Sequence, residues 1–268
     1  MDKLQATKER EKYLNRRKRR KNSIRIWQVG ILLVFLATWE ITARLGWIDS
    51  FILSQPSRIW QTFLNMAQND LFMHVGVTVY ETLVGFILGV VSGCLLAVVL
   101  WWSDFISKVS EPYLVVLNSL PKIALGPVII IIVGAGTKAI IFMALAISLI
   151  VTVLEMLNGF RNTDKEYIKM AATFGANKRQ IFTKIVFPYN ISTLFNSLKI
   201  NIGLSLVGVI AGEFLVSKAG LGYLIVYGGQ VFKLDLVMTS VIILAIVAAV
   251  MYEAVVLLQK LVLKWYGH

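Results

Sequence analysis

The chain has 268 residues, of which 57% are hydrophobic and 16% carry a charge, and its formal net charge is +12. Soluble domains average about 25% charged residues, so this composition indicates a membrane protein. One cysteine, Cys94, excludes a disulfide framework and a cysteine-based zinc site. The two histidines, His74 and His268, are too few and too far apart for a metal centre.

Residues 1–25 form a basic arm, which carries most of the excess positive charge. Basic arms can bind nucleic acid, but next to a membrane span the positive-inside rule and anionic lipid explain the charge better. We therefore expect membrane lipid, and no nucleic acid, as the partner of this arm.

The first transmembrane helix is predicted within residues 26–50, where an apolar run is long enough to cross the roughly 30 Å core of a bilayer. Glu40 and Arg44 are four residues apart near its outer end, and we expect them to pair. Residues 51–268 are predicted to form the protein's core. This core begins with a short interfacial helix at 57–67 and holds five further transmembrane helices.

The second span, at about 74–101, carries small residues four apart at Gly85, Gly89, Gly93 and Ala97. Such a ribbon permits close helix contact, either within one chain or at a dimer seam. The third span is predicted to begin at Pro112 and to end near residue 133, with a break around Pro121.

The remaining spans are predicted at about 139–157, 190–215 and 236–263. Polar residues inside such spans are candidates for the lining of a path across the membrane, because they are costly in lipid. The alternatives are packing at the kink, bonding to their own helix, and local capping. The candidates are Asn118, Lys122, Ser148, Asn201 and Glu213.

The longest polar interruption after the first span is the loop at residues 159–189. Thr163 and Glu166 have the spacing of a capping box, and Gly175 is expected to end the helix that they begin. A second amphipathic helix is predicted to follow and to end at Pro188 or give way to another there. The pair either lies at the lipid interface or fits a groove of a partner protein.

Six spans place both termini and the loop on the same side of the membrane. Basic residues gather on that side, so the positive-inside rule places it in the cytoplasm. No P-loop and no metalloprotease or nucleophile-elbow motif occurs in the sequence. We therefore expect no enzyme activity and no cofactor, and a transport step would take its energy from another chain.

The loop resembles the EAA loop in the membrane permease subunits of bacterial ABC importers. That pattern reads E-A-A-x-x-x-G-A, a spacer and then I-x-L-P, and this chain has Lys169-Met170-Ala171, Gly175-Ala176 and Ile185-Val186-Phe187-Pro188. Lys169 stands where the family has its name-giving glutamate. Further strings resemble the nitrate, sulfonate and taurine branch, namely SQPSRIW at 54–60, LPKIALGP at 120–127, VGAGTK at 133–138 and AGEFLVSKAGLGYLI at 211–225.

The resemblance implies an all-α integral membrane protein of the type I ABC importer permease architecture, with six transmembrane helices and both termini cytoplasmic. It implies a second permease copy, two copies of an ABC ATPase and an extracytoplasmic binding protein, in the plasma membrane of a bacterium. The ATPase would dock on a coupling segment comprising Lys169, Met170, Ala171, Ala172, Thr173, Phe174, Gly175 and Ala176.

The substrate that the resemblance implies is a small organic or inorganic anion such as a sulfonate, taurine or nitrate. The alternative is a thiamine precursor or another heterocycle. A secondary transporter is disfavoured by the absence of internal repeats and of a dense set of intramembrane acids. An intramembrane enzyme is disfavoured by the absence of a nucleophile–base or metal set.

Overall fold

A computed structural model describes residues 2–47 and 49–265, and these residues form helices, turns and loops without a strand. The long helices are α1 (Asp2–Arg44), α4 (Leu71–Trp102), α7 (Thr137–Arg161), α11 (Ile191–Val216) and α13 (Leu234–Trp265). The shorter elements are α2 (Ser50–Leu53), α3 (Pro56–Ala67), α5 (Asp104–Ser119), η1 (Lys122–Leu125), α6 (Gly126–Val133), α8 (Lys165–Thr173), α9 (Lys178–Ile181), η2 (Phe182–Val186), α10 (Phe187–Tyr189) and α12 (Leu221–Gln230).

The chain divides into two compact units, residues 1–64 and 65–268. In the first unit, Arg44 Nε lies 2.7 Å from Glu40 Oε1, which confirms the predicted pair. The same carboxylate accepts hydrogen bonds from the Ser57 backbone N–H at 3.1 Å and the Ser57 hydroxyl at 3.0 Å. Glu40 therefore also holds the first turn of α3. The sequence pattern did not reveal this contact, because Glu40 and Ser57 are 17 positions apart.

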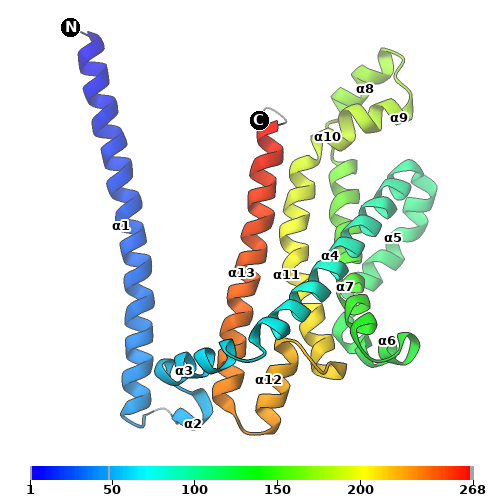
Figure 1. Cartoon of the computed structure of the whole chain (residues 1–268). Coiled ribbons are helices and arrows are strands. Elements are labelled where there is room, and N and C mark those ends of the chain that lie inside the picture. The colour runs from blue at the N-terminus through cyan, green and yellow to red at the C-terminus, as the bar shows by residue number, and fades with distance from the viewer. Residues whose placement is uncertain (1, 48, 266–268) are drawn as a thin grey trace. The chain divides into compact units, whose positions relative to one another are not determined.

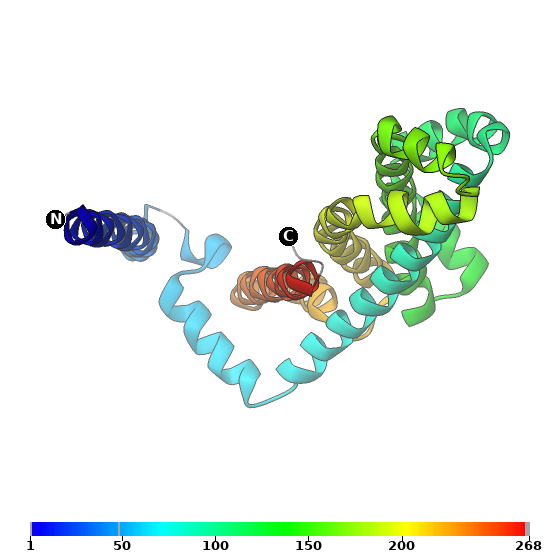
Figure 2. The same ribbon diagram turned by 90° about the horizontal axis from the view of Figure 1, so that it is seen from above.

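In the second unit, α4, α7, α11 and α13 are the long apolar helices (Figure 1). Seen from above, α4 slants across the unit while α11 and α13 are viewed nearly along their axes (Figure 2). Among the described residues, five helices including α1 are long and apolar enough to cross a membrane, and six spans result if the bent pair around Pro121 counts as one. The prediction of an all-helical membrane protein is confirmed.

The bent pair consists of α5 and the η1–α6 segment, which meet at 88°. The break lies where we expected it, because Leu120 precedes Pro121 and adopts an extended conformation that ends α5. The predicted start at Pro112 is wrong. The helix begins at Asp104, since the Ser103 hydroxyl caps it by accepting from the Ile106 N–H, and Pro112 lies inside it.

The tightest helix contact joins the glycine ribbon of α4 to α7. A Cβ atom on Gly85 would lie 2.5 Å from the Ala144 Cβ, and one on Gly93 would lie 2.7 Å from the Thr152 Cβ. Van der Waals contact between carbon atoms needs about 3.5–4.0 Å, so only glycine fits at these positions. The ribbon therefore packs within one chain, as the first of the two alternatives predicted.

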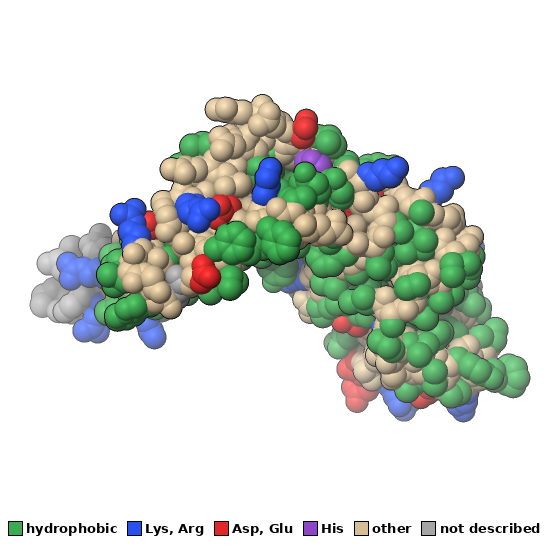
Figure 3. All heavy atoms as spheres, turned by 90° about the horizontal axis from the view of Figure 1, so that it is seen from below, with side chains coloured by type: hydrophobic (Ala, Val, Ile, Leu, Met, Phe, Trp, Pro, Cys, Tyr) green, Lys and Arg blue, Asp and Glu red, His purple; other side chains and the backbone are tan. Residues whose placement is uncertain are grey.

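Three smaller apolar clusters hold the other helices to this pair. Phe86 of α4 meets Ile202 of α11 and Met251 of α13. Two further clusters fasten α6 and α11 to α7, formed by Ile129, Ala139 and Met143, and by Ile140, Ala144 and Val209. Seen from below, hydrophobic side chains, uncharged side chains and backbone make up most of the visible surface, and charged side chains of both signs are scattered among them (Figure 3).

We predict that leucine at Gly85, Gly89 or Gly93 separates α4 from α7 and lowers stability by about 1–3 kcal/mol or more. The measurement is the amount of folded protein in the membrane and its thermal unfolding midpoint in detergent. Gly76→Leu is the matched control, because Gly76 lies on the same helix and a Cβ there would meet nothing within 4 Å. Wild-type levels and midpoints for all three ribbon variants would contradict the assignment.

Candidate functional site

The loop between α7 and α11 is closed at its base by a buried hydrogen bond. Asn190, at the start of α11, donates from Nδ2 to the Thr163 hydroxyl at 2.8 Å and to the Val186 carbonyl at 2.8 Å. Gly159 lies against the same amide, since a Cβ there would be 2.7 Å from Asn190 Oδ1. The two ends of the loop are thus tied to each other across 27 residues.

The second half of the loop is anchored to the C-terminal ends of α4 and α7. The Phe182 ring lies 5.0 Å from the Trp101 ring and 5.4 Å from the Phe160 ring, between centroids. Lys178 turns back onto the bundle, where its Nζ donates to the Trp102 carbonyl at 2.8 Å and lies 5.4 Å above the Trp101 ring. These contacts fix α9 and η2 to the bundle.

The first half of the loop, α8, contains no buried residue. Only Ile168 packs partly against the core, whereas Tyr167 and Met170 are about half exposed and Phe174 is 84% exposed. An apolar face therefore runs along α8 to Phe174, and most of it is not covered by this chain.

The caps of the two loop helices differ from the predicted capping box. Asp164 caps α8 by accepting from the Glu166 N–H at 2.8 Å. Thr163 does not fill that role, because α8 begins at Lys165 with Asp164 as its N-cap, and the Thr163 hydroxyl instead accepts from Asn190 and donates to the Gly159 carbonyl. A true capping box occurs at Asn177 and Gln180, where each side chain accepts from the other's backbone N–H.

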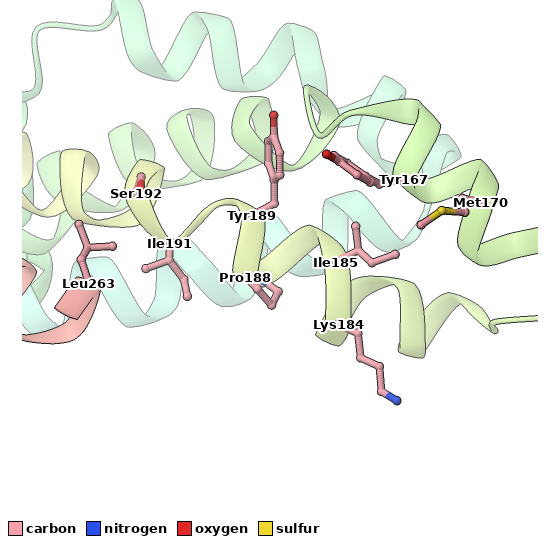
Figure 4. A pocket seen from close by; sticks show the side chains of 9 residues that line it. All are labelled: Tyr167, Met170, Lys184, Ile185, Pro188, Tyr189, Ile191, Ser192 and Leu263. Atoms are coloured by element: carbon pink, nitrogen blue, oxygen red, sulfur yellow. The ribbon is translucent and has the colours of Figure 1, made fainter. Parts of the chain in front are cut away.

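The eight residues of the predicted coupling segment lie at the end of α8 and in the turn that follows. Gly175 has φ +79°, a conformation that favours glycine, and it ends α8 as expected. Lys169 and the tip of the segment are exposed. Beside α8 lies a cavity of about 540 Å³, lined by Tyr167, Met170, Lys184, Ile185, Pro188, Tyr189, Ile191, Ser192 and Leu263 (Figure 4).

Three of the five candidate path residues are buried between helices. Ser148 faces the glycine ribbon, and its hydroxyl bonds to the Leu145 carbonyl. Asn201 donates to the Ser197 carbonyl and hydroxyl, both at 3.0 Å. The other two lie at the α5–η1 break, where Asn118 is exposed, Lys122 is half-buried, and the Lys122 Nζ donates to the Asn118 carbonyl at 2.9 Å. The structure does not gather these five residues into one site.

The third buried candidate, Glu213, caps α12. Its carboxylate accepts from the Gly222 N–H at 2.5 Å and from the Thr78 hydroxyl at 2.6 Å. Thr78 in turn accepts from the Leu221 N–H at 2.8 Å, and His74 Nδ1 accepts from the Gly220 N–H at 3.0 Å. Side chains of α4 and α11 thus satisfy the first N–H groups of α12, which its own helical bonds leave free.

A polar groove that the sequence pattern did not reveal lies at the loop ends of α7 and α11. It has a volume of about 440 Å³ and is lined by Glu155, Asn158, Gly159, Asn162, Tyr189, Asn190, Thr193, Asn196 and Ser197. Glu155 Oε2 is buried without a hydrogen-bond partner. Lys199 adjoins the groove, with its Nζ 3.4 Å from Asn196 Oδ1. The signal in the sequence that could have revealed this groove is the spacing of three to four residues between polar residues at the end of a span.

An all-helical chain of five or six candidate spans among the described residues, with a tied and partly uncovered loop between two of them, defines a multi-pass membrane protein. Residues 85–267 match the family model described as "Binding-protein-dependent transport system inner membrane component". The chain belongs to this family of inner-membrane transport components, and its bacterial relatives are permease subunits of ABC transporters.

Several curated proteins are similar over most of their length. A probable ABC transporter permease protein of Haemophilus influenzae is 28% identical, covering 85% of this chain and 91% of its own. The formylaminopyrimidine transport permease protein ThiX of Halalkalibacterium halodurans is 25% identical (87% and 93%). The putative aliphatic sulfonates transport permease protein SsuC of Bacillus subtilis is also 25% identical (89% and 88%).

Among solved structures, the fold is similar to a chain of the MetNI methionine ABC transporter in an inward-facing conformation. The TM-score is 0.65 at 20% identity, and the match covers 72% of this chain and 95% of that one. The family match and the curated relatives confirm the resemblance to ABC permeases, including the sulfonate branch. The similarity to the solved structure confirms the permease fold.

We predict that Thr78→Val destabilises the chain by about 1–3 kcal/mol, because it leaves the buried Leu221 N–H unpaired and removes a donor from Glu213. The thermal unfolding midpoint in detergent measures this effect. Thr82→Val is the control, since the buried Thr82 hydroxyl bonds only to the Thr78 carbonyl of its own helix at 2.7 Å. Equal midpoints for the two variants would show that Thr78 does not hold α12.

Proposed function

We propose that this chain is the pore-forming permease of an ATP-driven importer, driven by two ATPase subunits that dock on α8 and the Gly175 turn. The observation that carries the proposal is the uncovered apolar face of the loop, where Phe174 is 84% exposed. An exposed aromatic side chain beside small residues is typical of the hot spot of a protein interface.

The anchoring of the loop supports its role as a lever. The hydrogen bond between Asn190 and Thr163 closes its base, and Phe182 and Lys178 hold its second half to the bundle. A displacement of the docked α8 would therefore move the ends of α7 and α11 with it. On ATP binding, closure of the ATPase pair would turn the spans from inward-open to outward-open.

The proposed orientation places both termini and this loop in the cytoplasm. Its support is the positive-inside rule, because Arg161, Lys165, Lys169, Lys184 and their basic neighbours all lie in the loop. Two permease copies would form the pore, and an extracytoplasmic binding protein would deliver the solute from the other side.

The proposed substrate is a small anion such as a sulfonate, taurine or nitrate. Its support is the similarity to a sulfonate permease and the position of Lys199 beside the polar groove. A second candidate is an uncharged nitrogen heterocycle. It is favoured by the unpartnered Glu155 oxygen among amide side chains, which would accept hydrogen bonds from N–H groups and repel an anion.

We predict that Phe174→Ala leaves the permease folded but weakens its association with the ATPase by about 2 kcal/mol or more, as loss of a hot spot does. Co-purification of the ATPase and the rate of ATP hydrolysis are the measurements. Phe72→Ala is the control. Phe72 is also highly exposed, but it lies in the first turn of α4, at the end of that helix that does not contact the loop. Undiminished ATPase binding by the Phe174 variant would refute docking at this tip.

We predict that Glu155→Gln speeds uptake of taurine or nitrate into proteoliposomes that hold the assembled transporter, because one repulsive charge is removed. If the chain instead carries a formylaminopyrimidine, the same variant slows its uptake, since a hydrogen-bond acceptor is weakened. Glu253→Gln, at an exposed position on α13, is the control for a change of charge alone. Uptake of the heterocycle and not of the anions would overturn the anion proposal.

A further inference from the structure

Two buried acids lie against each other at the end of the bundle opposite the loop. Glu81 of α4 and Glu213 of α11 are each only 1% exposed. The carboxyl of Glu81 faces Glu213 and the side chain of Thr137 on α7. Two ionised carboxylates in such a place repel each other, and each also loses its hydration.

The hydrogen bonds around the two acids are unequal. Glu213 accepts from the Thr78 hydroxyl and the Gly222 N–H, and also from the Tyr223 N–H. The carboxylate of Glu213 also faces the N-terminus of α12, where the helix dipole favours negative charge. By contrast, both carboxyl oxygens of Glu81 are buried without a hydrogen bond of acceptable geometry. The surroundings therefore stabilise a charge on Glu213 more than a charge on Glu81, which faces only the Thr137 side chain as a possible donor.

No positive charge in the described part of the chain compensates the pair. The ion pairs found there join Arg44 to Glu40 and Arg161 to Glu111. The titratable neighbours on the packed elements are His74 on α4, whose Nδ1 accepts from Gly220, and Tyr223 on α12. On α7, Lys138 follows Thr137, but it is exposed and forms no ion pair with either acid.

We propose that Glu81 and Glu213 form a buried proton-binding pair, in which Glu81 holds the proton and donates it to the Glu213 carboxylate that caps α12. The ligand of this site is a proton, and the site carries one negative charge in place of two. Removal of the proton would set a second charge against Glu213 and loosen the attachment of α12 to α4. This end of the subunit is therefore sensitive to pH, whichever solute the transporter carries.

The sign of the pH effect follows from the proton that the folded chain retains. In an unfolded chain, Glu81 releases this proton above the ordinary glutamate pKa of about 4.3. The folded chain binds more protons than the unfolded chain above that pH, so the contribution of the pair to stability falls as pH rises. Replacement of Glu81 by glutamine keeps a hydrogen-bond donor for Glu213 and removes the titration.

The first test is infrared spectroscopy of the full chain at neutral pH, in a detergent without ester groups. We expect a carbonyl band of an un-ionised carboxylic acid in the wild type, its loss in Glu81→Gln, and its retention in the control Glu155→Gln. Absence of the band from the wild type would overturn the proposal, and this measurement does not depend on any variant folding.

The second test is the thermal unfolding midpoint from neutral to alkaline pH. We expect a fall in the wild type and in Glu155→Gln, and a smaller fall in Glu81→Gln. An equal fall in Glu81→Gln would overturn the proposal. So would a wild-type midpoint that rises with Na⁺ but not with K⁺ and loses this response in Glu81→Gln, because the pair would then hold a metal cation and not a proton.

Discussion

The close approach of α4 to α7 is the contact on which both ends of the subunit depend. Glycine at positions 85, 89 and 93 lets the two backbones come together, and the contact continues into an apolar cluster that includes Leu100 and Phe160. Phe182 of the loop packs on that cluster. At the other end, the same α4 presents Thr78 to α12. Because packed interiors resist deformation, a change at one end of this pair reaches the other end as a rigid displacement.

The loop combines a stiff base with an uncovered tip. A lever transmits movement only if its attachment is stiffer than the contact that moves it, and the buried Asn190–Thr163 bond provides such an attachment. The tip makes few contacts with its own chain, since α8 has no buried residue. In the proposed function, the apolar area left open at α8 is the surface that the ATPase covers.

Features set by neighbouring residues were predictable from the sequence, and features set by distant partners were not. The Gly175 break, the apolar spans and the Glu40–Arg44 pair depend on local conformation or on residues one helical turn apart. The capping box at Thr163 failed because its hydroxyl binds Asn190, which lies 27 residues away. Glu213 looked like a path residue because its partner Thr78 lies 135 positions earlier in the chain. The coupling segment remains a prediction, although its exposure agrees with docking.

Polarity within a span does not reveal which face it serves, and here the buried polar side chains serve helix contacts. Ser148, Glu213 and the Asn201 amide N–H group form hydrogen bonds within the bundle, whereas Asn201 Oδ1 is buried without a partner. A separate set of polar side chains lines the groove at the ends of α7 and α11. Asn190 belongs to that groove and also closes the base of the loop. In the proposed transport cycle, a movement of the loop would therefore change the groove directly, because Gly159, Asn162 and Tyr189 of the loop line it together with Asn190.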